Sequence, residues 1–191
     1  MRDLWPMNSL VDASMALFAH ALALAIGVVL LGAVVHKLRG WSAFRAAVAD
    51  YRLLPDALVA PAAVALCALE AIAGIALLVD GLRIVGASLA IAAIGVATAA
   101  VTINVLRGRT DVDCGCGGIE GRQPLSWGLV ARNGALLVAL AAIAFVPPAN
   151  STGFVAYATL AAATLALATL YGAASQLLAN RSHVADLASR S

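Results

Sequence analysis

The sequence predicts an all-α integral membrane protein, a single-domain bundle of about five transmembrane helices over residues 1–191. Hydrophobic residues make up 63% of the chain and charged residues only 12%, with a mean hydropathy of +0.96, whereas roughly a quarter of a soluble domain is charged. Five apolar stretches reach the length of about 20 residues that a hydrocarbon core requires. They cover about residues 14–35, 57–79, 84–106, 127–146 and 154–178.

The order of these stretches predicts how the helices are connected. The first stretch is too long for a cleaved signal peptide, and its basic residues follow it rather than precede it. The second and third stretches are joined only by DGLR, and the fourth and fifth by about PPANST. Links this short predict antiparallel hairpins. The net charge of +2 gives no indication of a nucleic-acid partner.

The long connection after the first stretch predicts an interfacial helix at about residues 41–53. Its apolar residues recur at helical spacing, with two arginines along one edge: Trp41, Phe44, Val48, Tyr51 and Pro55, with Arg45 and Arg52. Two interpretations remain open, a membrane-surface anchor and a lid over a site between the helices. Two spans separate this connection from the polar connection 107–126, so both lie on one face of the bundle.

The segment DCGCGG, from Asp113 to Gly118, places two cysteines one residue apart in the polar connection. Two extended residues span about 6.6–7 Å, and a disulfide needs Cα atoms about 4.4–6.8 Å apart. Closing Cys114 to Cys116 therefore requires a bent backbone, which Gly115 allows. We expect a strained, exposed and labile bond, because so short a loop gains little structural stability from a cross-link.

Two other interpretations of the cysteines stay open. Half of a zinc site is one, but structural zinc takes four ligands, and the other candidates are distant in sequence: Cys67, His20, His36 and His183. Cysteines without a chemical role are the other. We favour thiol redox exchange and predict no metal.

Polar residues inside the apolar stretches are costly in lipid and are expected to face the bundle interior. Glu70 lies near the middle of its span, Arg132 and Asn133 lie near the start of the fourth, and Asn104 lies near the end of the third. We expect a structural network that joins these helices. A role in proton or quinone handling is the alternative. Cys67 and His20 are expected to be packing residues.

Several motifs in order along the chain resemble the MauE family of methylamine-utilisation proteins and the wider MauE/DoxX set of redox-associated membrane proteins. They are HKL, then Phe44 and YRLLP, Glu70 within ALEAIAGIALL, an Arg-Gly pair after the third span, CGCGG and PLSWGLVARN. The likeness covers about residues 17–146 and is sharpest over 114–133. The family pattern reads Cys-x-Cys-Phe-Gly, and Gly117 stands here in place of the Phe, which is expected to loosen the packing beside the cysteines.

The resemblance implies a thiol–disulfide oxidoreductase in methylamine metabolism, with Cys114 and Cys116 as the redox pair. It implies a thioredoxin-like, membrane-tethered partner similar to MauD, and the methylamine dehydrogenase small subunit as the client whose disulfide formation and maturation it supports. It also implies a bundle distantly similar to vitamin K epoxide reductase, four helices plus one, with a lipid quinone as electron acceptor, although no quinone motif is present. A non-catalytic membrane scaffold of a maturation complex is the alternative. We nominate Cys114 as the partner-facing sulfur, because it comes first from the polar side.

Two arguments disagree on which side of the cytoplasmic membrane the cysteines lie. Nine of the twelve basic residues fall on the cysteine face: Lys37, Arg39, Arg45, Arg52, Arg107, Arg109, Arg122, Arg181 and Arg190. The positive-inside rule would place that face in the cytoplasm. Disulfide chemistry and the family resemblance place it outside, in the periplasm or its equivalent. We expect the outer face.

Overall fold

Six α-helices make up the described part of the chain. The computed structural model describes residues 6–79, 81–115, 124–146 and 154–188, and the side chains of residues 14–79, 81–115, 124–146 and 158–177. The helices are α1 (Pro6–Arg39), α2 (Trp41–Asp50), α3 (Asp56–Leu78), α4 (Arg83–Leu106), α5 (Trp127–Phe145) and α6 (Phe154–Ala188). All except α2 contain a segment long and apolar enough to cross a membrane. The prediction of a helical membrane bundle with five spans is therefore confirmed.

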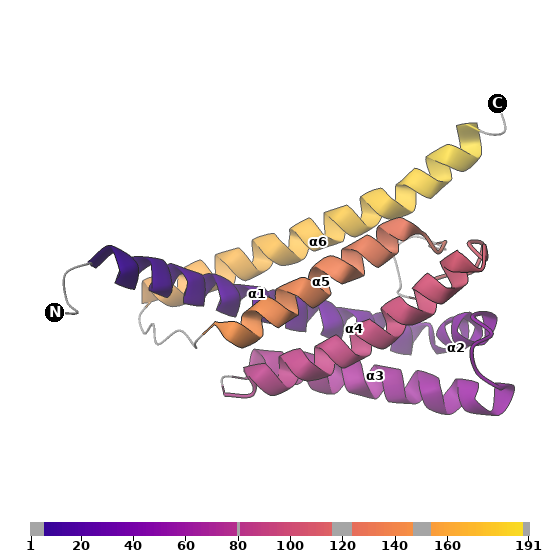
Figure 1. The fold of residues 1–191 in the computed structure, drawn as a ribbon, viewed down its shortest axis with the longest axis horizontal. Helices are drawn as coiled ribbons and strands as arrows, with labels where there is room; N and C mark the ends of the chain where they lie inside the picture. The colour runs from indigo at the N-terminus through magenta and orange to yellow at the C-terminus, as the bar shows by residue number, and fades with distance from the viewer. Residues whose placement is uncertain (1–5, 80, 116–123, 147–153, 189–191) are drawn as a thin grey trace.

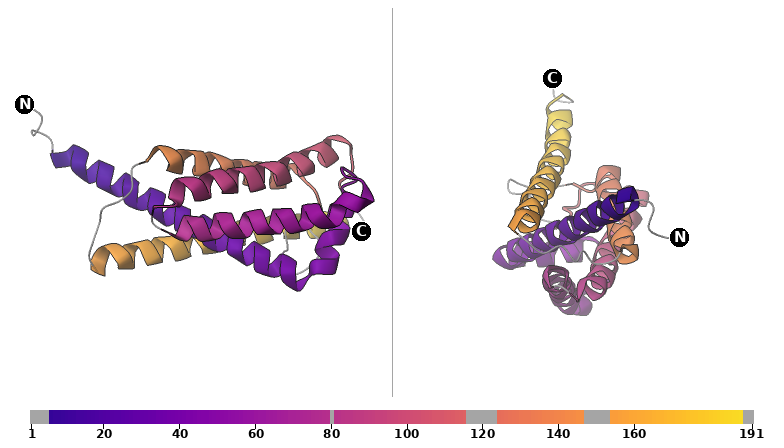
Figure 2. Two further views of the ribbon diagram at one scale, coloured as in Figure 1. Left: turned by 90° about the horizontal axis from the view of Figure 1, so that it is seen from below. Right: turned by 90° about the vertical axis from the view of Figure 1, so that its left-hand side faces the viewer.

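Four of the long helices close into a ring, and the fifth lies outside it. Helix α1 packs on α3, α3 on α4, α4 on α5, and α5 returns to α1, while α6 packs mainly against α1. Seen along the bundle, α6 lies to one side of the other helices (Figure 2). The short helix α2 lies at the end where α3 begins and α4 ends (Figure 1). This end of the bundle therefore carries α2 and, at the end of α4, the start of the cysteine-bearing connection.

Small side chains let the ring helices approach one another closely. The main core combines residues from all four helices: Ala19, Ala23, Ile26, Leu30, Ala73, Leu77, Ala87, Ala90, Ile94, Leu140 and Ile143. Between α3 and α4, a Cβ atom added to Gly86 would lie only 2.6 Å from the backbone nitrogen of Leu77. Close backbone approach through small residues is the usual packing mode inside membranes, where van der Waals contact replaces the hydrophobic driving force.

A short helix, α2, is present where the sequence predicted an interfacial helix, and its buried apolar residues face the protein. Phe44 and Tyr51 are buried, Trp41 and Val48 are half-buried, and Arg45 is exposed. The helix ends at Asp50, three residues before the predicted boundary at residue 53. The chain then turns through Arg52, which has a left-handed backbone (φ 49°), and this turn leads into α3.

Candidate functional site

The cysteine-bearing connection leaves α4 and returns to α5 through a neck of backbone contacts. Asp113 and Pro124 form an isolated antiparallel bridge. The backbone nitrogen of Leu125 donates to the carbonyl oxygens of Thr110 (3.1 Å) and Val112 (3.2 Å). The neck therefore fixes the start of the loop and Cys114 to the bundle. Cys116, the second predicted redox residue, lies outside the described residues.

Gly115 turns the chain directly after Cys114. Its φ is +65°, a left-handed conformation that strongly favours glycine, and its backbone nitrogen donates to Oδ1 of Asp113 (3.1 Å). A Cβ atom at this position would lie 3.1 Å from the Cβ of Ala47 and 3.4 Å from Cδ2 of Phe44, both on α2. The predicted bend at Gly115 is confirmed. Glycine is needed there for close contact with α2 as well as for backbone freedom.

The Cys114 side chain is buried, which corrects the expectation of an exposed bond at this position. Only 7% of its surface is accessible. It lies in an apolar cluster contributed by the α2–α3 turn, α4 and α5: Tyr51, Val101, Leu125 and Leu129. The sequence places Cys114 in a polar segment, but the neck pulls it back among the helix ends. The hydropathy of the surrounding residues therefore does not predict that Cys114 is buried.

Hydrogen bonds hold the end of α2 to the cysteine loop and to α4. The Tyr51 hydroxyl donates to the carbonyl oxygen of Cys114 (3.1 Å). The Arg109 guanidinium donates to the carbonyl oxygens of Asp50 (2.7 Å) and Tyr51 (3.1 Å), where the last turn of α2 leaves carbonyls without helical partners. It also donates to Oδ1 of Asn104 (3.0 Å). We call Tyr51, Arg109 and Asn104 the α2 clamp.

The deepest predicted polar residue, Glu70, is paired with a lysine that sequence reasoning placed elsewhere. The Lys37 ammonium donates to both carboxylate oxygens, at 2.6 Å and 2.5 Å, and each residue is only 5% exposed. In the sequence Lys37 falls in the positively charged connection after the first apolar stretch, whereas α1 continues through it to Arg39. The sequence did indicate that Glu70, as a carboxylate inside a span, needs a cationic partner, but it did not show which residue supplies it.

Phe44 of α2 links this ion pair to the cysteine loop. Its ring lies 5.2 Å from the Lys37 ammonium, a cation–π distance, and it forms a buried cluster with Ala63 and Cys67 of α3. The same ring borders Gly115. Helix α2 therefore covers the buried ion pair and contacts the cysteine loop, which favours the lid interpretation over a simple surface anchor.

The remaining predicted residues form a separate cluster between α5 and α6. The Arg132 guanidinium donates to Oδ1 of Asn133 (3.2 Å) and to the Ser175 hydroxyl (3.2 Å), and it lies over the Tyr171 ring at 5.4 Å. The single network expected from the sequence is thus divided into three clusters, around Glu70, Asn104 and Arg132. These groups lie between different pairs of helices. The sequence of a single span does not show which neighbouring helix its polar residue faces.

Fold and site together define a multi-pass helical membrane protein in which a cysteine loop is held beneath a short helix at one end of the bundle. A family model described as methylamine utilisation protein MauE matches residues 15–147. The chain therefore belongs to the MauE family of methylamine utilisation proteins.

Individual relatives agree with the family assignment. The chain is 36% identical to a methylamine utilization protein MauE of Paracoccus denitrificans, over 84% of this chain and 91% of the relative. It is 37% identical to that of Paracoccus versutus, over 76% and 78%, and 45% identical to that of Methylophilus methylotrophus, over 58% and 57%. No solved structure matches the chain, so the likeness to vitamin K epoxide reductase stays a prediction.

The cavity at α2 offers no route from Cys114 to a quinone. A cavity of about 380 Å³ lies between α2 and the start of α3, and its α2 residues are Ser42, Arg45, Ala46 and Ala49. Phe44 and Ala47, which border Gly115, project from the opposite side of α2 at about 100° per residue. Because α2 separates the cavity from the cysteine loop, we derive no electron transfer to a quinone through it.

Proposed function

We propose that the protein is a membrane thiol–disulfide exchange protein that supports disulfide formation in the methylamine dehydrogenase small subunit, with Cys114 and Cys116 as the exchanging pair. The proposed partner is a thioredoxin-like, membrane-tethered protein similar to MauD. The observation that carries the proposal is the position of Cys114. Its backbone is fixed by the neck and the α2 clamp, and Gly115, the single residue between the two cysteines in the sequence, has a left-handed conformation.

The burial of Cys114 changes the roles proposed for the two sulfurs. A partner thiolate must reach the sulfur that it attacks, and only 7% of Cys114 is accessible. We therefore withdraw the nomination of Cys114 and assign Cys116 as the partner-facing sulfur. Cys114 then becomes the resolving sulfur, protected from other thiols until the mixed disulfide has formed.

In the proposed exchange, the Cys116 thiolate attacks a disulfide of the partner. A bond forms between Cys116 and one partner sulfur, and the other partner sulfur leaves as a thiolate. Cys114, having given up its proton, then attacks Cys116, which closes the Cys114–Cys116 disulfide and releases the partner as a dithiol. The reverse sequence passes the disulfide from Cys114 and Cys116 to the partner, and this is the direction that disulfide formation in the client requires.

Trapping the mixed disulfide tests the assignment. Cys114→Ser should accumulate a reducible adduct with the thioredoxin-like partner, because no resolving sulfur remains. Cys116→Ser should accumulate much less. Cys67→Ser, a buried control on α3, should keep maturation activity, whereas both loop variants should lose it. Adduct in Cys116→Ser alone would return Cys114 to the partner-facing role.

A non-catalytic scaffold of a maturation complex is the second candidate, and helix α6 favours it. This helix packs mainly against α1 and leaves large apolar side chains exposed at Leu165, Leu170 and Leu177. Such a face suits a lipid surface or another transmembrane helix. Full maturation of the client by the double variant Cys114→Ser, Cys116→Ser would establish the scaffold and reject the exchange mechanism.

A further inference from the structure

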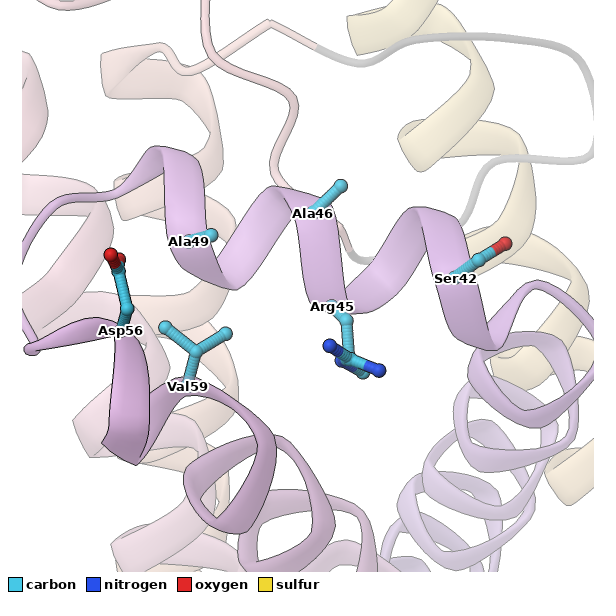
Figure 3. A pocket seen from close by; sticks show the side chains of 6 residues that line it. All are labelled: Ser42, Arg45, Ala46, Ala49, Asp56 and Val59. Carbon is cyan, nitrogen blue, oxygen red and sulfur yellow. The ribbon is translucent and has the colours of Figure 1, made fainter.

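The cavity between α2 and α3 has the features of a ligand site separate from the cysteine loop. Its volume is about 380 Å³, and two α3 residues, Asp56 and Val59, complete its lining. The Arg45 side chain extends from α2 toward α3, while the Asp56 carboxylate extends from the first turn of α3 toward α2 (Figure 3). The cavity thus presents one positive and one negative side chain, from different helices.

These two charges lie in one cavity without being paired to each other. Among the described side chains, Lys37 and Glu70 form an ion pair with each other. Neither Arg45 nor Asp56 has an ionic or hydrogen-bond partner among those side chains. Both are exposed. Opposite charges that line one cavity without pairing fit a ligand that carries both signs, because one end of it can pair with each.

The cavity lies at the level where lipid headgroups are expected. Asp56 is the first residue of α3, a predicted membrane span, and the half-buried Trp41 begins α2, in keeping with the enrichment of tryptophan at membrane interfaces. Farther along α3, the apolar side chains of Leu58, Val64 and Ile75 are exposed, so the outer surface of this span is apolar. A lipid whose headgroup occupies the cavity would therefore have its tails beside apolar helix surface.

We propose that this cavity binds the headgroup of an ethanolamine phospholipid. The phosphate pairs with the Arg45 guanidinium. The primary ammonium pairs with the Asp56 carboxylate, to which it donates N–H hydrogen bonds. A choline headgroup has no N–H to donate, and a glycerol headgroup has no positive charge for Asp56.

Native mass spectrometry tests the proposal on the full-length protein. The protein is incubated with equal amounts of phosphatidylethanolamine, phosphatidylcholine and phosphatidylglycerol carrying the same acyl chains, and the retained lipid is counted. The ethanolamine lipid should be retained about two- to fivefold more than either other lipid, the ratio expected of partly exposed charge pairs. Arg45→Gln should lower the retention of all three, and Asp56→Asn should abolish the preference over phosphatidylglycerol.

Matched charge changes outside the cavity are the controls. Arg107→Gln and Asp111→Asn alter exposed residues of the α4–α5 connection and should leave the ethanolamine preference unchanged. Equal retention of the three lipids by the unmodified protein would overturn the proposal. So would a preference for phosphatidylglycerol, which would make this an anionic-lipid site, or an Asp56→Asn variant that keeps the ethanolamine preference.

Discussion

Gly115 is under two constraints at the scale of the residue, and substitution can separate them. Its φ of +65° disfavours any side chain, and its missing Cβ leaves room for Ala47 of α2. Gly108, at the end of α4, is a matched position, since its φ is +72° but nothing lies within 4 Å of an added Cβ. Alanine at either position carries the left-handed strain of about 1–2 kcal/mol, but only at Gly115 does it also meet α2.

We therefore predict that Gly115→Ala separates the cysteine loop from α2 and exposes Cys114, whereas Gly108→Ala does not. The measurement is the rate at which a maleimide modifies Cys114 in a protein whose other two cysteines are serine. Modification should be faster in Gly115→Ala than in the parent and unchanged in Gly108→Ala. Equal rates in all three proteins would mean that contact with α2 does not protect the thiol.

The Lys37–Glu70 pair should be intolerant of losing one charge and tolerant of losing both. Glu70→Leu leaves a buried ammonium without its partner, and breaking a buried ion pair lowers the free energy of unfolding by about 3–5 kcal/mol. Glu70→Gln should cost less, because its amide oxygen still accepts from Lys37. The double variant Lys37→Met, Glu70→Leu should recover much of the loss. Thermal unfolding in detergent tests this order, and a Glu70→Leu protein as stable as the parent would contradict it.

Glu70, Lys37 and Cys114 differ in how far the sequence alone predicts their surroundings. Glu70 could be identified because a charge in an apolar run stands out in the sequence. Lys37 could not, because it stands at the end of such a run, where basic residues usually meet headgroups. Its partner depends on where α1 crosses α3, and the burial of Cys114 likewise depends on contacts between distant segments. A hydropathy profile predicts neither the crossing of α1 and α3 nor the contacts that bury Cys114.

Helix α2 illustrates, at the scale of the element, how much a local pattern can predict. The spacing of Trp41, Phe44 and Val48 predicted the helix and its apolar stripe, but left open whether that stripe faces the membrane or the protein. Because two spans separate the two long connections, the sequence also placed this helix at the same end of the bundle as the cysteines. The hydrogen bonds that fasten it were not predictable. They join Arg109 to backbone carbonyls some 58 residues earlier in the chain, and any residue type offers a carbonyl.

Arg109 should therefore control the stability of the last turn of α2. Arg109→Gln removes the guanidinium that joins the carbonyls of Asp50 and Tyr51 to Asn104, and we predict faster amide hydrogen exchange in α2 and at Gly115. Arg107→Gln, an exposed arginine two residues away, is the control and should leave exchange unchanged. Matching exchange in both variants would show that the clamp adds no local stability.

At the scale of the whole molecule, the distribution of charge must be reconciled with the chemistry of the loop. Nine basic residues lie on the cysteine face by sequence, but two of them are engaged inside the protein. Lys37 is paired with Glu70, and Arg109 holds the end of α2. Arg45 lines the proposed lipid site. Two of the nine residues thus have structural roles on this face, and a third has a proposed ligand, which weakens the charge bias as an indicator of the cytoplasmic side.

We accordingly predict that the cysteine face lies outside the cytoplasm. Because Cys114 is buried, a single introduced cysteine is the better reporter, in a protein whose native cysteines are serine. Arg107→Cys reports on the cysteine end, and Leu82→Cys, in the exposed α3–α4 turn, reports on the opposite end. A membrane-impermeant maleimide applied to cells with a permeabilised outer membrane, or with a single membrane, should label Arg107→Cys directly and Leu82→Cys only after lysis. The reverse pattern would place the loop in the cytoplasm, where glutathione and thioredoxin keep thiols reduced, and would remove disulfide formation from the protein's proposed function.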